Sequence, residues 1–280
     1  MRTFKKTMLL TAAMIATVTV ANAADMIPDL VEPPLEIVTQ SSTGWYLRGD
    51  IGYAALKSKG VLYHQGTASL TGEFERHDVD DTWMLGGGVG YQVTDYFRVD
   101  ATINHYFKTD FNGSSATGAT TCTLTGATLC DFSDNSDLTV TAYMMNAYLD
   151  LGTYSRITPY VGFGIGAAQL HWTDLINSEI CVSGCTGSVA TNHFGEADLR
   201  FAYSLHAGAS YDIDAYWKWD AAYSYTHIEG GPMFHFEAGN ANSGRQGYDS
   251  GLDIHAFKLG LRYQFGGSTL ASYDDGNVYK

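Results

Sequence analysis

The chain has 280 residues, of which 45% are hydrophobic and 13% aromatic, and this content excludes an intrinsically disordered protein. Its 30 acidic and 16 basic residues give a formal net charge of −14 at pH 7, so its surface repels phosphate backbones and no nucleic acid is expected as a partner. The 31 glycines against 5 prolines favour tight turns and strands over long helices.

Residues 1–23 have the three parts of a cleaved signal peptide. Basic residues lie within 1–6, an uncharged and mostly apolar stretch covers 8–20, and small residues follow at Ala21 and Ala23. The apolar stretch is too short to cross a hydrocarbon core, which needs about 20 residues. We therefore expect 1–23 to be removed on export and the Pro-rich acidic stretch 24–43 to form a periplasmic leader.

From residue 44 onward, apolar and polar residues alternate with a period of two, which predicts β-strands. In one run Trp217 and Trp219 share a face, while Lys218 and Asp220 share the other. Many of the runs are longer than an average strand of a soluble sheet. Eight such runs follow one another, at 45–56, 82–93, 97–107, 138–151, 159–172, 199–213, 217–227 and 252–265.

The connections between these runs alternate in length. Long connections lie at 57–81, 108–137, 173–198 and 228–251, and short ones at 94–96, 152–158 and 214–216. Outer-membrane barrels make this pattern, with short periplasmic turns and long external loops. The sequence thus predicts an all-β fold: an eight-stranded antiparallel up-and-down transmembrane β-barrel over 44–265, with four long external loops and both termini periplasmic.

A soluble barrel or β-sandwich, with its apolar face inward, is the alternative. Three features favour the membrane version: long strands, loops that alternate in length, and aromatic residues such as Trp45, Trp172 and Phe265 at the strand ends. Closure of the barrel would also leave no strand edge unpaired in lipid. We therefore expect the apolar face to point outward and the polar face inward.

Glycine occupies alternate positions in two of the runs, at 86, 88 and 90 and at 162, 164 and 166. Such rows mark one face of a strand that a neighbour approaches closely. Residues 162–167 resemble the glycine pattern of a dinucleotide-binding motif, but no helical pattern follows them, so we do not expect such a site. We interpret both rows as space in the lumen for Tyr46, Tyr148 and Tyr160.

Charges of both signs lie on the predicted inward face. The interior of an eight-stranded barrel is just wide enough for side chains to fill it, and buried charges are costly unless they are paired. We therefore expect a polar plug, and a path for ions is the alternative. The expected interior network consists of Arg48, Asp50, Arg98, Asp100, Asp150, Arg200, Asp212, Lys218, Asp220, Lys258 and Arg262.

The four cysteines fall into two close pairs. Seven residues separate Cys122 from Cys130 and three separate Cys181 from Cys185, each pair within a stretch rich in Gly, Ser and Thr. In an exported chain this spacing favours two local disulfides. A zinc site that adds a nearby histidine to the second pair is the alternative, but no CxxC motif is present, so we expect no metal and no other cofactor.

The last run resembles the signal that the barrel assembly machinery reads, with Lys258, Gly260, Tyr263 and Phe265 at its polar, glycine and aromatic positions. With the runs 45–52, 146–152 and 157–166, the chain resembles the small surface barrels of alphaproteobacteria. These belong to the OmpA-like and OmpX-like outer-membrane β-barrel superfamily, often labelled "porin family". The resemblance covers 44–265. The family usually ends at the terminal aromatic residue, whereas 266–280 follow here and are expected to form a short periplasmic tail.

The resemblance implies an integral outer-membrane protein of a Gram-negative bacterium that supports envelope integrity and host contact, without catalytic residues. The leading hypothesis is therefore a structural barrel whose loops meet host or surface ligands, and a narrow porin is the alternative. An enzyme that modifies lipid A is the third class. His105, His171, His227 and His255 lie near external strand ends, close in sequence to carboxylates such as Asp253, but no G-x-S-x-G motif is present.

Membrane lipid, lipopolysaccharide and the barrel assembly machinery are the other expected partners. Basic residues near the external strand ends are few, so a strong lipopolysaccharide cluster is not visible. Lys57, Lys59, Arg76 and Lys108 are the residues placed to meet a phosphate group.

Overall fold

The alternating sequence forms β-strands in a computed structural model that describes residues 43–65, 70–119, 122–236 and 245–265. The predicted signal peptide (1–23), nearly all of the predicted leader (24–43) and the predicted tail (266–280) lie outside these ranges. Within them the chain contains no helix long and apolar enough to cross a membrane. The strands are β1 (Gly44–Ser58), β2 (Val61–Gln65), β3 (Leu70–Glu73), β4 (Arg76–Val79), β5 (Thr82–Thr94), β6 (Phe97–Ser114), β7 (Leu129–Asp150), β8 (Ile157–Trp172), β9 (Leu175–Ser183), β10 (Ser188–His193), β11 (Ala197–Asp212), β12 (Trp217–Ile228), β13 (Gly231–His235), β14 (Arg245–Asp249) and β15 (Leu252–Gln264).

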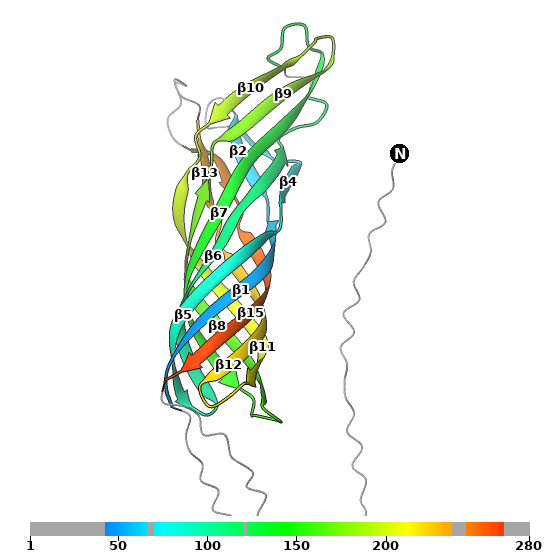
Figure 1. Cartoon of the computed structure of the whole chain (residues 1–280). Coiled ribbons are helices and arrows are strands. Elements are labelled where there is room, and N and C mark those ends of the chain that lie inside the picture. Colours follow the sequence, from blue (N-terminus) through cyan, green and yellow to red (C-terminus); the bar gives the residue numbers. More distant parts are fainter. Residues whose placement is uncertain (1–42, 66–69, 120–121, 237–244, 266–280) are drawn as a thin grey trace, which may run out of the picture. The chain divides into compact units, whose positions relative to one another are not determined.

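The long strands form an antiparallel β-barrel (Figure 1). Successive pairings run β1–β5, β5–β6, β6–β7, β7–β8, β8–β11, β11–β12 and β12–β15, and β15 pairs in turn with β1. Each of these strands overlaps one of the alternating runs in the sequence. We call the barrel end near residues 95–96, 151–156 and 213–216 the short-turn end, and the opposite one the long-connection end.

The sequence predicts that the long connections are loops, but the structure shows that they contain further β-strands. Pairing of β6 with β7 continues past a bulge at Tyr106/Thr109 as far as Gly113 and Asp134, so both strands extend beyond their predicted limits. β9 pairs with the extended part of β7, and β10 pairs with β9. A second sheet has the order β13-β14-β2-β3. Most of these strands are only four to six residues long, too short for their alternation to be recognised in the sequence.

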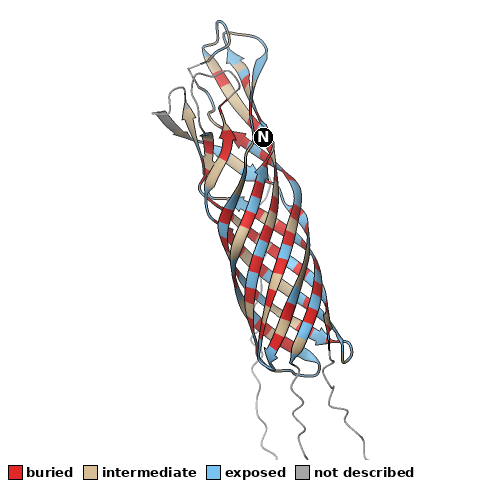
Figure 2. Ribbon diagram, turned by 90° about the vertical axis from the view of Figure 1, so that its left-hand side faces the viewer, coloured by how far each residue is buried: buried red, intermediate tan, exposed pale blue. Residues whose placement is uncertain are grey.

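Burial along the barrel strands alternates residue by residue (Figure 2). In β1, for example, every second residue from Tyr46 to Leu56 is buried and most residues between them are exposed. The exposed set is apolar and aromatic, with Trp219 64% and Phe257 71% exposed. A belt of this kind would aggregate in water and is stable in lipid, and it is the reverse of what a soluble barrel presents.

The interior has two chemically distinct halves. The half toward the short-turn end, here called the charged half, holds the inward polar side chains of each strand, including Arg48, Arg98, Asp150, Asp220 and Arg262. The half toward the long-connection end, here called the apolar half, contains a continuous hydrophobic core. Its buried members include Ala54, Leu56, Met84, Tyr106, Phe111, Leu138, Val140, Ala142, Met144, Ala168, Leu170, Trp172, Ala202, Ile228, Phe234, Leu252, Ile254 and Ala256.

Candidate functional site

Strand register brings the inward charges of the charged half together. Arg48 and Asp50 lie on β1 opposite Gly88 and Gly86 of β5, and Asp100 on β6 lies opposite Asn146 of β7. The glycines leave room that side chains from neighbouring strands fill. A Cβ at Gly90 would lie 2.2 Å from the ring of Tyr46, and one at Gly162 would lie 2.4 Å from the ring of Tyr148. The glycine rows thus accommodate tyrosines inside the barrel.

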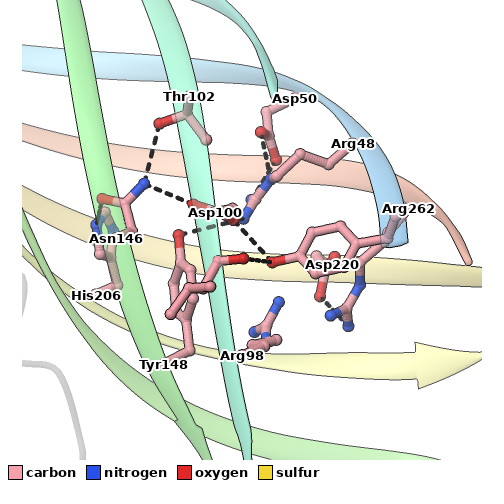
Figure 3. Close-up of polar contacts among 12 residues, drawn as sticks. Arg48, Asp50, Arg98, Asp100, Thr102, Asn146, Tyr148, His206, Asp220 and Arg262 are labelled. Carbon is pink, nitrogen blue, oxygen red and sulfur yellow. Dashed lines mark hydrogen bonds and ion pairs between the residues drawn. The ribbon is translucent and has the colours of Figure 1, made fainter. Parts of the chain in front are cut away.

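Arg48 joins two carboxylates from different strands (Figure 3). Its Nε and Nη2 donate to both oxygens of Asp50, at 2.9 and 2.7 Å, a bidentate contact. Its Nη1 donates to Asp100 Oδ2 at 3.1 Å and to the Tyr148 hydroxyl at 3.3 Å. All of these groups are buried, so Arg48 bridges the two carboxylates and offsets part of their charge in the barrel interior.

Asp100 accepts hydrogen bonds from three side chains, those of Arg48, Tyr46 and Asn146. The hydroxyl of Tyr46 donates to Asp100 Oδ2 at 3.1 Å, and Asn146 Nδ2 donates to Oδ1 at 2.7 Å. Asn146 also donates to Thr102 Oγ1 at 3.0 Å, and its Oδ1 lies 3.2 Å from Nε2 of His206 (Figure 3). The contacts run across β1, β6, β7 and β11, so one polar network holds several strands together.

Arg98 is held mainly by aromatic faces. Its side chain is fully buried, its Nε donates to Asp150 Oδ1 at 3.1 Å, and its guanidinium carbon lies 4.3 Å from the ring centroid of Tyr148 and 4.4 Å from that of Tyr160. Within the described residues, its Nη1 and Nη2 have no hydrogen-bond partner. Cation–π attraction to the two rings therefore stabilises this charge together with the Asp150 ion pair.

The remaining predicted charges form smaller groups. Arg262 Nη2 donates to Ser210 at 2.7 Å and lies 3.4 Å from Asp220, and Lys218 pairs with Asp212 near the short-turn end. Lys258 is buried in the same half, with no carboxylate of a described residue within 4.0 Å of its Nζ. The charged half thus holds equal numbers of either sign: Arg48, Arg98, Lys218, Lys258 and Arg262 against Asp50, Asp100, Asp150, Asp212 and Asp220.

Arg200 lies apart from the other interior charges. Near the start of β11, at the long-connection end, it donates to Asp249 at 2.5 Å and to the carbonyl oxygen of Pro232 at 2.5 Å, and its Nε lies 3.4 Å from Asp198. The apolar half separates this group from the charged half. The single network expected from the sequence is therefore divided into two, because alternation reveals which way Arg200 points but not its height along the barrel.

The assembly-signal residues lie on β15. A Cβ at Gly260 would lie 2.3 Å from Asp50 Oδ1, so this glycine leaves room for the Asp50 carboxylate. The ring of Tyr263 packs against those of Trp217 at 4.8 Å and Phe265 at 5.2 Å on the outer surface. The backbone N–H of Phe265 donates to the carbonyl of Trp45 at 2.8 Å, which joins the end of this strand to β1.

Both cysteine pairs form disulfides, Cys122–Cys130 and Cys181–Cys185. Cys130 on β7 is directly opposite Cys181 on β9, so the two bridges lie side by side beyond the barrel. Glu179 comes near the first pair, but the sulfurs of a disulfide are not available as thiolate ligands for a metal.

Glu179 is a structural residue that the sequence did not single out. Its carboxylate accepts hydrogen bonds from the backbone N–H of Thr123 at 2.9 Å, the N–H of Leu124 at 3.0 Å and the Thr123 hydroxyl at 2.5 Å. Burial raises the pKa of Glu179, but these hydrogen bonds outweigh the burial and hold the pKa below its usual value. The one signal in the sequence is that Glu179 is the sole charged residue between Asp174 and Glu196.

One histidine from the enzyme hypothesis meets a carboxylate. His227 Nδ1 lies 2.6 Å from Asp253 Oδ1, and Tyr225 donates to the same oxygen at 3.0 Å. Among the described residues no Ser, Thr or Cys is a hydrogen-bond partner of His227, and Ser224 lies three positions away on the other face of the strand. His105 instead meets Thr141 at 2.9 Å, and His255 meets Tyr223 at 2.7 Å. The His227–Asp253 pair thus lacks the nucleophile that acyl transfer needs.

Comparison with known proteins agrees with this architecture. The sequence profile of the family described as "Outer membrane protein beta-barrel domain" matches residues 10–265. An uncharacterized protein of Brucella abortus (strain 2308) is 34% identical over 276 residues, covering 90% of this chain and 95% of its own. A Rickettsia bellii (strain OSU 85-389) protein named "Putative adhesin" is 27% identical over 261 residues, covering 92% and 99%.

Similar solved structures include Neisserial surface protein A (NspA), with 15% identity and a TM-score of 0.41 over 79% of this chain and 97% of that one. The outer membrane protein OprG from Pseudomonas aeruginosa has 14% identity and a TM-score of 0.41 over 79% and 95%. The predicted resemblance to alphaproteobacterial outer-membrane barrels and the outer-membrane location in a Gram-negative bacterium are confirmed. The chain belongs to the outer membrane protein beta-barrel domain family.

Proposed function

We propose that the protein is a plugged surface barrel: eight long strands close around a filled interior, and the strands beyond the barrel present a surface for adhesion or host contact. The observation that carries this proposal is the charged half, where guanidinium groups, carboxylates and tyrosines from facing strands meet across the lumen. A non-catalytic role follows, with the long-connection end outside the cell and lipid and lipopolysaccharide around the wall.

Two further observations support a plug over a pore. The interior width of eight strands is one that side chains can fill. An ion that entered from the long-connection end would first have to cross the apolar half, whose buried residues Leu170, Ile228 and Ile254 offer it no polar group. Apolar constrictions exclude ions by dewetting, so the two halves act as barriers in series.

The strands beyond the barrel are suited to contact with a partner. The β9–β10 pair projects past the end of the barrel (Figure 1) and is joined to β7 by strand pairing, with the two disulfides side by side at one end of the contact. A rigid exposed scaffold of this kind loses little entropy on binding. The "Putative adhesin" name of the Rickettsia bellii relative supports the same role.

The test is planar-bilayer conductance of the chain from Ala24 onward, refolded in detergent and checked by the mobility of boiled and unboiled samples on a gel. We expect a heat-dependent mobility shift and no steady channel. Asp100→Asn, in the charged half, and Asp214→Asn, in a short turn, form a matched pair. Steady openings in the wild type that change with Asp100→Asn but not with Asp214→Asn would make the protein a narrow porin instead.

A further inference from the structure

The strands beyond the barrel enclose a chamber above the apolar half. Tyr63 of β2 and Phe234 of β13 come from one sheet, and Phe132 of β7 and Leu175 of β9 come from the other. Its volume is about 340 Å³, which lies within the range of small-molecule sites and is too small for a folded partner. Its lining therefore decides which small molecules it can hold.

Four aromatic rings, of Tyr63, Phe74, Phe132 and Phe234, line the chamber. Phe74 packs edge-on against Tyr63, with ring centroids 5.5 Å apart, and against Phe111 at 6.2 Å. Phe234 packs against Trp172 at 5.8 Å, which connects the wall to the hydrophobic core of the apolar half. Rings fixed by such packing form an apolar surface before a ligand binds, so binding costs little side-chain entropy.

One carboxylate, Asp134 of β7, also lines the chamber, and it is only 1% exposed. It accepts hydrogen bonds from the backbone N–H of Ser115 at 2.7 Å and from Asn177 Nδ2 at 2.5 Å. Two acceptor positions remain on its oxygens.

Asp134 has no positive counter-charge. Among the described residues, no Lys, Arg or His nitrogen forms an ion pair with its oxygens. The internal segments 66–69, 120–121 and 237–244 contain no Lys, Arg or His. By contrast, Asp50, Asp100 and Asp220 in the barrel each meet a guanidinium.

Burial of an unpaired charge is expensive, and the cost falls when a cation arrives. The chamber lining contains one carboxylate, Asp134, and one histidine, His193, but no Lys or Arg, so a ligand of positive sign complements the carboxylate. An anion or a phosphate group would be repelled by the same carboxylate.

We propose that this chamber binds a small organic cation, with its ammonium group at Asp134 and its apolar or aromatic body against Phe74, Phe132 and Phe234. This goes beyond surface contact with a macromolecule. It is also independent of whether the barrel conducts, since Asp134 and the rings around it lie at the long-connection end, away from the charged half.

The test compares three probes that share a phenyl group and differ in the charge of the head group: 2-phenylethylammonium, 2-phenylethanol and phenylacetate. Each is titrated calorimetrically at pH 7.5 into the refolded full-length mature protein, with empty detergent micelles as the blank. We expect 2-phenylethylammonium to bind at least about tenfold more tightly than the alcohol, because a hydrogen bond to a charged partner is the stronger one. Phenylacetate is expected to bind most weakly.

Asp134→Asn should remove this preference and bring the ammonium down to the affinity of the alcohol. The matched control is Asp131→Asn, the same change on the opposite face of the same strand, where the Asp131 side chain accepts a hydrogen bond from Gly118 at 2.6 Å. The control variant should bind all three probes with the affinities of the wild type. Ala116→Phe, which fills the chamber, should abolish binding of all three probes.

The proposal is overturned if the alcohol or phenylacetate binds the wild type as tightly as the ammonium, or if Asp134→Asn keeps the preference. Absence of saturable binding by every probe up to about 10 mM, a concentration above the usual range for a specific small-molecule site, overturns it as well. If Asp134→Asn fails to refold, the wild-type probe series and Ala116→Phe still decide the matter.

Discussion

The two halves of the barrel interior are both filled by side chains, one by charged groups and the other by apolar groups. Both are lined by every second residue of the same strands, and both are buried, yet one holds paired charges and the other hydrocarbon. In the apolar half each side chain gains from burial on its own. In the charged half many groups depend on partners from other strands, as Asp100 depends on Tyr46, Arg48 and Asn146.

This difference implies different responses to mutation. A truncated apolar side chain loses its own contacts and leaves a cavity, whereas a removed charge also leaves its partner buried without compensation. The charged half therefore makes the larger demand on specific residues and is the half in which register matters most.

The largest effect is expected from Arg48→Met. It leaves the buried carboxylates of Asp50 and Asp100 without their shared guanidinium, and loss of one partner of a buried ion pair costs about 3–5 kcal/mol. The measurement is the free energy of unfolding in urea with detergent or lipid present, followed by gel mobility.

A second variant separates charge from shape. Arg48→Met combined with Asp50→Asn removes one uncompensated carboxylate and should recover part of the loss, since the Tyr46 and Asn146 hydrogen bonds to Asp100 remain. If the combined variant is less stable than Arg48→Met alone, lost packing rather than unpaired charge explains the effect.

In the apolar half, Leu170→Ala is the corresponding change. Leu170 is fully buried, so its truncation should lower the free energy of unfolding by about 2–5 kcal/mol, and the volume-conserving Leu170→Met by less than about 1.5 kcal/mol. The two halves are compared by combining Leu170→Ala with Arg48→Met. We expect the two losses to add to within about 0.5 kcal/mol, because the residues lie in different halves. A larger departure from additivity would show that the halves are coupled.

Much of the barrel could be predicted from the sequence because its determinants are local. A period of two decides which face a residue occupies, and the alternation of connection lengths identifies neighbouring strands. The cysteine pairs were predictable for a similar reason, since each pair lies within a few residues along the chain.

The division of the interior could not be predicted, because it depends on height as well as face. Arg200 and Asp212 point inward from the same strand, but twelve residues at about 3.3 Å each put them near opposite ends of the barrel. The chamber was hidden for a related reason: Asp134 and Asn177 are 43 positions apart and meet only because β9 pairs with the extended part of β7.

A moderate effect is expected from Gly162→Ala, which tests how tightly the charged half is packed. The added Cβ would lie 2.4 Å from the ring of Tyr148, the ring that contacts both Arg48 and Arg98, so the variant should lose about 1–3 kcal/mol of unfolding free energy. Gly49→Ala is the matched control, because nothing lies within 4 Å of its Cβ. Equal losses in the two variants would mean that glycine is required for the strand backbone and not for the tyrosine.

The smallest effect concerns Glu179, a buried carboxylate held by N–H and O–H donors instead of by guanidinium. Because the pKa of Glu179 is lowered in the folded chain, its contribution to stability is present above the unfolded value of about 4.3 and is lost as the pH falls through the folded value. Amide hydrogen exchange of residues 122–130, corrected for the intrinsic effect of pH, should lose about five- to tenfold of its protection below that range. In Glu179→Gln the protection should already be low at pH 6 and change little on acidification. If wild type and variant lose protection in parallel, other carboxylates that accept backbone hydrogen bonds nearby, such as Asp131 from Gly118, hold this segment and Glu179 does not.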